Sequence, residues 1–205
     1  MLRFLISSYL VLLLASCAPA FTKGLIEVPP TKSEIKNPYF ADSSQDYIYK
    51  AKIDIYGRYF GGILVIKKTG DQTHRVVFTT EFGSKIFDFE YEGDTFTKNF
   101  VLGDLDKKII VNTLKNDFKI LIQETMLVQS QLDGLETTIY KAPGAKRNNY
   151  YFFGTTNQLE KIIHASSSKE KVMFLFDDVH QKVANTITIN HKNISLDIAL
   201  NYFKK

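Results

Sequence analysis

Four histidines and one Asp-rich stretch are the residues with the clearest capacity for catalysis or metal binding. The histidines are His74, His164, His180 and His191. They do not form a His-Glu-x-x-His pattern, and a single cysteine excludes paired-cysteine zinc spacing. Asp177-Asp178-Val179-His180 reads as a polar hairpin turn rather than a ligand cluster. Without a Gly-x-Ser-x-Gly elbow or a phosphate-binding glycine loop, we expect no enzymatic activity, metal or cofactor.

Cys17, the only cysteine, offers chemistry of a different kind. It follows Leu14-Ala15-Ser16, at the end of an apolar run that begins after Arg3. One positive charge, about eleven mostly apolar residues and small residues before a cut site form the order of a secretory signal peptide. The run is too short to span a bilayer as a helix. Residues 1–16 are therefore predicted to be a signal peptide.

The sequence Leu14-Ala15-Ser16-Cys17 resembles the lipobox of bacterial lipoproteins. That resemblance implies that Cys17 becomes the first mature residue and carries a diacylglyceryl group and usually a third acyl chain. Two or more chains hold a protein at a membrane stably, whereas one chain, at about 0.8 kcal/mol per buried methylene, does so only marginally. The alternative is a plain signal peptide that happens to contain a cysteine. The lone cysteine, however, occupies the one position with a chemical use for it.

Residues 17–45 are predicted to be the acylated cysteine and a flexible tether. Pro19, Pro29, Pro30 and Pro38 interrupt this stretch, together with lysines, serines and threonines. Ala18 is not the aspartate that resembles an inner-membrane retention signal, and no acidic cluster follows Cys17 to resemble a surface-display signal. We therefore expect a protein anchored in the outer membrane, on its periplasmic face.

Residues 46–205 have the length of a single domain. The formal net charge is only +4 and no run of Lys or Arg exceeds two residues, so the chain has no nucleic-acid footprint. Because Cys17 has no partner for a disulfide, a hydrophobic core must hold the fold. The 16 Phe and 11 Tyr, with no Trp, favour a β-rich domain with many half-buried aromatic positions.

Alternating apolar and polar residues predict about ten or eleven strands. They cover residues 49–55, 59–67, 74–80, 85–92, 95–101, 137–141, 150–154, 159–165, 171–176, 184–190 and 194–202. The short turns between them predict an antiparallel meander, and Gly61-Gly62 predicts a bend. The predicted fold is mainly β (α+β): a curved antiparallel sheet or incomplete β-barrel with one long helix packed on or in it.

The predicted helix extends from an N-cap at Asp104 to about Gln123. Leu105, Ile109, Leu114, Phe118 and Leu121 recur in it at near-helical spacing. Its second half leaves an alternative open, because Phe118, Ile120 and Ile122 also alternate as they would in a strand.

The inward faces of the predicted strands are candidates for the lining of an apolar cavity suited to lipid-like ligands. These residues are Ile53, Ile55, Val76, Phe78, Phe87, Phe89, Leu196 and Ile198. The simpler interpretation of each is ordinary core. Periodicity does not decide whether the cavity is open or filled by side chains.

The order of segments resembles the LolB family of outer-membrane lipoprotein receptors, within the LolA/LolB superfamily of incomplete barrels. The resemblance rests on Ile55-Tyr56-Gly57-Arg58, the strand at 74–80, the loop Glu81-Phe82-Gly83-Ser84 and the strand at 86–91. The final strand pair, 186–190 and 194–202, is also similar. Two departures are the prolines between residues 28 and 39, where the family has an N-terminal helix, and Glu81, where the family's loop has a proline.

The resemblance implies a protein that takes lipoproteins from a LolA-like periplasmic carrier, binds their acyl chains and helps insert them into the outer membrane. It also implies that Phe82, just before Gly83 at the loop tip, contacts the membrane during release. The alternative for Phe82 is that its ring folds back onto the core. The alternative function is a non-catalytic periplasmic scaffold or assembly lipoprotein that binds a protein partner through an edge strand.

Overall fold

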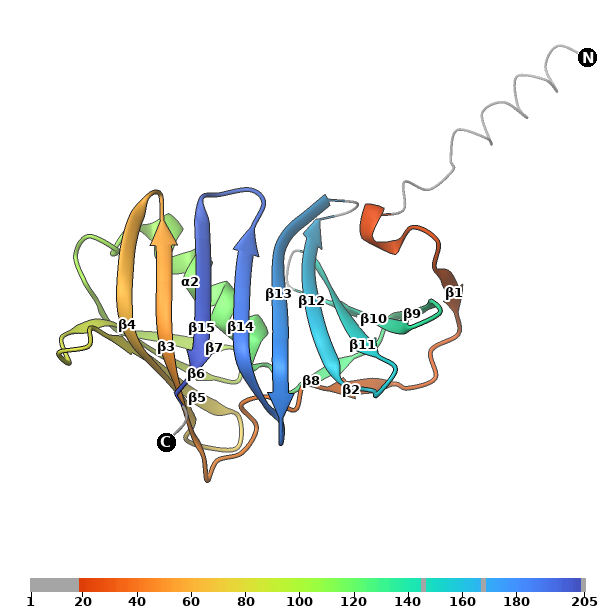
Figure 1. Cartoon of the computed structure of the whole chain (residues 1–205), viewed down its shortest axis with the longest axis horizontal. Helices are drawn as coiled ribbons and strands as arrows, with labels where there is room; N and C mark the ends of the chain where they lie inside the picture. The colour runs from red at the N-terminus through yellow and green to blue at the C-terminus, as the bar shows by residue number, and fades with distance from the viewer. Residues whose placement is uncertain (1–18, 145–146, 167–168, 204–205) are drawn as a thin grey trace, which may run out of the picture.

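The computed structural model describes residues 19–144, 147–166 and 169–203. They form one large antiparallel sheet curved around the helix α2 (Figure 1). In chain order the elements are η1 (Ala20–Thr22), β1 (Ile26–Val28), β2 (Glu34–Lys36), β3 (Asp46–Ile55), β4 (Arg58–Lys68), β5 (Thr73–Thr79), β6 (Lys85–Glu92), β7 (Thr95–Val101), α2 (Lys108–Ile122), β8 (Thr125–Leu127), β9 (Ser130–Asp133), β10 (Thr137–Pro143), β11 (Asn148–Gly154), β12 (Leu159–Ser166), β13 (Lys169–His180), β14 (Val183–His191) and β15 (Leu196–Tyr202).

The large sheet has 13 strands in the order β1-β9-β10-β11-β12-β13-β14-β15-β3-β4-β5-β6-β7, and β2 pairs separately with β8. Two meanders, β3 to β7 and β9 to β15, are joined where β15 pairs with β3. Because β1 and β7 are edges, the sheet is not a closed barrel. The predicted fold class is confirmed. The strand count is higher than predicted because β1, β2, β8 and β9 are too short to show an alternation.

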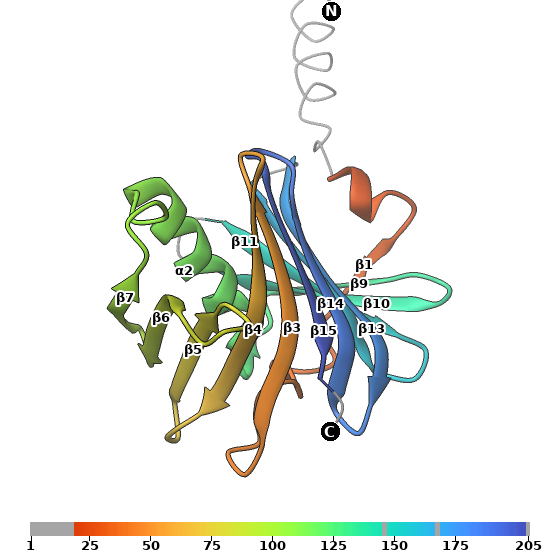
Figure 2. The ribbon, with the colours of Figure 1, turned by 60° about the vertical axis from the view of Figure 1, so that its left-hand side comes forward.

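The main core lies between the concave face of the sheet and α2. Register places Ile53 of β3 opposite Ile198 of β15, and both side chains are buried. Figure 2 shows α2 inside the curve of the sheet. There the helix buries Leu114, Phe118 and Leu121 in the same apolar cluster. Both halves of the helix are therefore held by tertiary burial, which resolves the helix or strand alternative in favour of the helix.

The predicted flexible tether needs correction. Within residues 17–45, the chain from Ala20 to Lys36 forms η1, β1 and β2, and Tyr39 and Phe40 are fully buried. The Tyr39 hydroxyl donates a hydrogen bond to the Leu159 carbonyl at 2.5 Å. The prolines do not prevent this packing, since Pro29 and Pro30 lie between two short strands rather than within one.

The predicted helix start is also wrong by three residues, because the N-cap is Lys107 rather than Asp104. Asp104 lies in a turn, and the helix begins at Lys108. The side chain of Asp104 instead pairs with Arg58 at the tip of the β3–β4 hairpin, at 2.5 Å. Leu105, assigned to the apolar helix stripe, is buried in the turn that precedes the helix. The pair Gly103-Asp104 therefore indicates the turn before the helix and not the N-cap of the helix.

Candidate functional site

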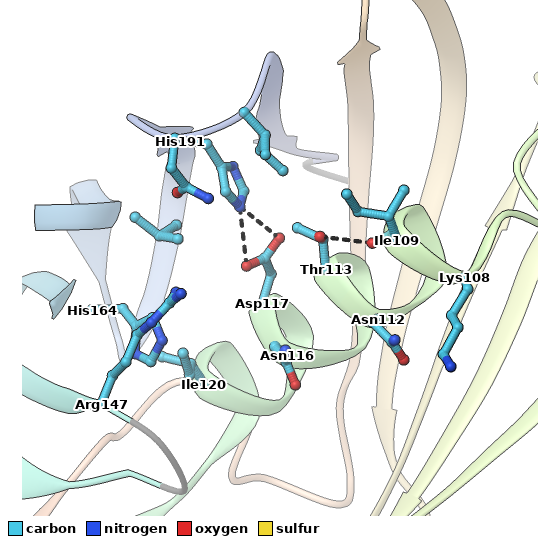
Figure 3. A pocket seen from close by; sticks show the side chains of 13 residues that line it. Lys108, Ile109, Asn112, Thr113, Asn116, Asp117, Ile120, Arg147, His164 and His191 are labelled. Atoms are coloured by element: carbon cyan, nitrogen blue, oxygen red, sulfur yellow. Dashed lines mark hydrogen bonds and ion pairs between the residues drawn. The ribbon is translucent and has the colours of Figure 1, made fainter. Parts of the chain in front are cut away.

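A cleft of about 520 Å³ lies between α2 and the concave face of the second meander (Figure 3). The helix contributes two adjacent stripes of side chains to it, and the sheet contributes β12, β13 and the β14–β15 connection. The lining residues are Lys108, Ile109, Asn112, Thr113, Asn116, Asp117, Ile120, Arg147, His164, Val172, His191, Asn193 and Ile194. Clefts of this size suit one small ligand.

Asp117 and His191 form a buried pair at the wall of the cleft. The His191 Nε2 lies 3.3 Å from Oδ1 and 3.2 Å from Oδ2 of Asp117. Figure 3 shows the two side chains facing each other from helix and sheet. On its other side, His191 Nδ1 lies 2.9 Å from the Leu196 carbonyl. Because a carbonyl only accepts, Nδ1 carries a hydrogen. The pair therefore ties α2 to the start of β15.

Burial changes the proton affinity of both members of this pair. It raises the pKa of the Asp117 carboxyl, an effect that the bond from His191 only partly opposes. Burial alone would lower the pKa of His191, but the hydrogen bond and the charge of Asp117 outweigh it and raise that pKa. The pKa of each group is therefore raised, and one hydrogen bridges Nε2 of His191 and the Asp117 carboxyl group.

His164 lies deeper on the same face, beside Arg147 (Figure 3). Its Nδ1 donates a hydrogen bond to Oδ1 of the buried Asn149 at 2.6 Å. Burial, together with the nearby charge of Arg147, lowers the pKa of His164 to about 4. His164 is therefore a neutral ring at pH 7, with its hydrogen on Nδ1 and an unprotonated Nε2.

Three polar residues and one valine form a row across four neighbouring strands at the cleft. Asn149 lies opposite His164, His164 opposite Val172, and Val172 opposite His191. One step further along the same face the paired residues are apolar, with Ile162 opposite Phe174. A row of hydrogen-bonding side chains thus borders an apolar interior, as in a site for a ligand with a polar and an apolar part.

The eight predicted cavity residues occupy a different place. Ile53, Ile55, Val76, Phe78, Phe87, Phe89, Leu196 and Ile198 are all buried in the main core. None of them lines the cleft. Side chains of α2 fill the space in front of them: the Phe118 ring is 5.6 Å from the Phe87 ring, which stacks on Phe89 at 4.7 Å. In this structure their interior is packed, and a role in ligand binding stays a prediction.

The predicted membrane loop presents its aromatic ring to solvent. Phe82 is 99% exposed. The turn beneath it is closed by backbone bonds from Thr80 to Ser84 at 2.8 Å and from Gly83 to Thr80 at 3.0 Å. Gly83 has a φ of 86°, which glycine adopts readily. The ring of Phe82 therefore does not fold back onto the core, and the turn that carries it is well defined.

Two features fix the base of this loop. A Cβ at Gly62 would lie 1.9 Å from the Thr79 carbonyl oxygen, so only glycine lets the end of β5 approach β4 so closely. Close approach thus explains Gly62, one of the two glycines that predicted a bend. Asp88, fully buried, binds Arg75 through two hydrogen bonds and Lys85 at 2.7 Å, and Lys85 directly follows the loop.

The other histidines serve structure. His74 is buried, with Nε2 3.0 Å from the Phe40 carbonyl. The prediction of a turn at Asp177 to His180 is wrong, because these residues continue β13. The turn comes after His180, where Gln181 and Lys182 take positive φ values. The strand continues because pairing with β14 continues on either side of Asp178, which has a φ of 49°: Asp177 lies opposite Thr186 and Val179 opposite Ala184. Within residues 19–144, 147–166 and 169–203, no group of three metal-ligating side chains occurs.

The predicted signal peptide and the acylation site Cys17 lie outside the described residues. Among the helices of the described part, none is long and apolar enough to cross a membrane.

Comparison with known proteins gives a likeness to a solved structure. No protein-family profile and no curated protein matches the sequence. The fold is similar to that of a LolA superfamily protein from Nitrosomonas europaea, with a TM-score of 0.48 and 8% sequence identity, over 82% of this chain and 88% of that one. At this identity and TM-score, the likeness concerns the course of the chain rather than its function.

The cleft residues were not among those predicted from sequence. Asp117 gave the one available signal, because it lies on the apolar side of the predicted helix between Leu114 and Leu121. An acid at such a position needs a buried partner. Its partner, His191, is distant in the sequence and is identified only by the strand register.

Proposed function

We propose that this protein is a lipid-anchored, non-catalytic binding protein of the outer membrane's periplasmic face. It accepts an acyl chain of a lipoprotein, delivered by a LolA-like carrier, and helps insert that lipoprotein into the membrane. The observation that carries the proposal is the complete exposure of Phe82 on a closed turn. The anchor is acylated Cys17.

An exposed aromatic ring at a loop tip is unfavourable in water and favourable at a bilayer surface. Burying a Phe side chain is worth about 1.5–3 kcal/mol. Phe82 has Glu81 on one side and Gly83 on the other, so neither neighbour in the chain shields it. Contact with the membrane would remove this ring from water at the moment of release, when the cargo's acyl chain also leaves the protein.

The cleft supports the binding half of the proposal. Its wall includes Ile109, Ile120, Val172 and Ile194, and Ile109 is exposed at the mouth. The hairpin tip beside the mouth carries another exposed ring, Tyr56, whose backbone N–H donates to the Ser195 carbonyl at 2.9 Å. An apolar rim of this kind would ease passage of an acyl chain between the cleft and a bilayer.

Phe82→Glu tests this function most directly. We expect the variant to fold normally, because Phe82 makes no core contact, and to lose most of its ability to insert an acylated lipoprotein into liposomes. Phe82→Leu should retain activity. The matched control is Leu135→Glu, since Leu135 is also fully exposed in a hairpin turn. Full activity of Phe82→Glu, or equal loss in Leu135→Glu, would contradict a role for this loop.

One observation favours a second candidate function, that of a scaffold or assembly lipoprotein. The interior in front of β3, β5 and β6 is filled by side chains of α2, as expected if the sheet binds a partner by its edge. The edge strand β7 pairs only with β6 and is mostly exposed. A scaffold would purify with a protein partner and without acyl chains, and a proline in β7, at Thr97, would abolish that partnership.

A further inference from the structure

Two cations flank the cleft without an ion-pair partner in the part of the chain that the structure describes. Arg147 is half-buried where β11 begins, and Lys108 is exposed at the start of α2. Among the described residues, no carboxylate lies within ion-pair distance of either side chain. A half-buried guanidinium with unused donors has a strong preference for a carboxylate or phosphate, which it binds with two parallel hydrogen bonds.

The rest of the wall does not neutralise these charges. Asp117 is the single acid among the lining residues, and it is already paired with His191. The other polar lining residues, Asn112, Thr113, Asn116 and Asn193, are uncharged. The cleft therefore combines a positive potential with apolar side chains, which is the complement of an anionic amphiphile.

The dimensions of the cleft fit one chain rather than several. The lining residues of α2 extend from Lys108 to Ile120, a rise of about 18 Å along the helix axis. Arg147 lies near Ile120 at one end of this length and Lys108 lies at the other (Figure 3). An elongated ligand can thus lie along the helix with its head group at Arg147 and its chain toward Ile109 and Ile194.

We propose that the cleft selects acyl chains that carry an anionic head group, and that Arg147 is the residue that binds that head group. This inference rests on the proposed use of the cleft for acyl chains and adds a second class of ligand to it, because the ester- and amide-linked chains of a lipoprotein carry no such anion. The anion is a carboxylate or a phosphate, as in a free fatty acid or a lysophospholipid. His164, which lies beside Arg147 and is held by Asn149, then acts as a positioning residue. Its own Nε2 takes up a proton and becomes a donor once an anion lies next to it.

The test uses the whole chain with Cys17→Ser, which has no acylation site, and measures binding by calorimetry. The ligands are palmitate, lysophosphatidylglycerol, the neutral hexadecanol, and a diacylated lipopeptide. We expect both anions to bind at least tenfold more tightly than hexadecanol, and Arg147→Gln to weaken them roughly tenfold while hexadecanol binding is unchanged. The control Lys52→Gln removes an exposed charge from the outer face of β3 and should change nothing.

A second readout separates head-group binding from a structural effect. NMR titration of His164 should show its pKa rising on addition of palmitate, and not on addition of hexadecanol. Tighter binding of palmitate or of lysophosphatidylglycerol would show which anion is the natural head group. Equal affinity for hexadecanol and the anions, or an equal loss of both in Arg147→Gln, would overturn the inference.

Failure of this inference and failure of the proposed function give different results. If the lipopeptide binds but the anions have no advantage over hexadecanol, only the selection of anionic head groups is refuted. If the lipopeptide does not bind, the proposed function is refuted, whatever the affinity for the anions.

Discussion

Asp117 and His191 connect the helix to the sheet through one buried contact. Their side chains are 3% and 1% exposed, so neither can exchange its partner for water. A buried pair of this kind adds little net stability compared with apolar residues, but the loss of one member is costly. The position of α2, and with it the shape of the cleft, depends on both being present.

Asp117→Ala should therefore lower the free energy of unfolding by about 3 kcal/mol, measured by urea denaturation. Its loss also leaves His191 with burial as the main influence, so the pKa of His191 should fall. The control is Asp106→Ala, which removes the ion pair with Lys98, in which each side chain is 42% exposed. This variant should lower the free energy of unfolding by less than about 1 kcal/mol. Equal costs for the two variants would show that the buried pair does not hold the helix.

His164 should make the protein sensitive to acid. Burial depresses its pKa from 6.5 to about 4. Between these values the unfolded chain binds a proton that the folded chain does not, so stability falls as the pH falls from 6.5 to 4 and is unaffected by His164 above 6.5. His164→Gln should reduce the loss of unfolding free energy between pH 6.5 and 4 by about 2 kcal/mol, measured from denaturation curves at several pH values.

A smaller slope should remain in His164→Gln, because burial also lowers the pKa of His74. An unchanged slope in His164→Gln would mean that His164 is protonated in the folded protein near pH 6.

At the scale of elements, the position of the Phe82 loop depends on the close approach of the neighbouring strands β4 and β5 at Gly62. The Thr79 carbonyl oxygen occupies the space of the missing side chain of Gly62. Strands β5 and β6 lose their regular register between Phe78 and Thr79, next to this contact. The backbone contact between Gly62 and Thr79 thus sets the position and direction of the loop, although neither residue is next to Phe82.

Gly62→Ala should displace this loop. We expect a cost of about 1–3 kcal/mol in the free energy of unfolding and reduced insertion of lipoproteins into liposomes, with α2 and the cleft retained. Gly103→Ala is the matched control, since nothing lies within 4 Å of a Cβ there. If Gly62→Ala inserted lipoproteins as well as Gly103→Ala does, the position of the loop would be irrelevant to function.

Elements with a long alternation could be predicted from the sequence, and short ones could not. β3, with its regular exchange of buried and exposed residues, was predicted to within three residues at its start. β1 and β2 have three residues each, too few to show a period. The prolines around them suggested a tether, although Tyr39 and Phe40 in the same stretch are core residues.

For the whole molecule, the sheet and helix could be predicted but the cleft could not. Phe82 belongs to one short loop, so its place at a loop tip could be predicted from the sequence, while its contact with a membrane stays a prediction. The cleft joins α2 to strands that are distant in the sequence: Asp117 meets His191, 74 residues later. Such a contact follows from the register of the strands and the start of the helix, and the predicted start was three residues early. The inward-facing residues instead suggested a cavity where the core is packed.

The central claim is that the cleft holds an acyl chain. Native mass spectrometry of the Cys17→Ser chain, purified from a membrane-containing lysate, tests it most directly. We expect a bound acyl chain in the wild-type cleft, and its loss in Asn116→Trp, which fills the cleft from an exposed helix position. The control Glu136→Trp, in an exposed hairpin turn, should keep the ligand. A chain that carries no acyl mass, or equal occupancy in Asn116→Trp and Glu136→Trp, would contradict the claim.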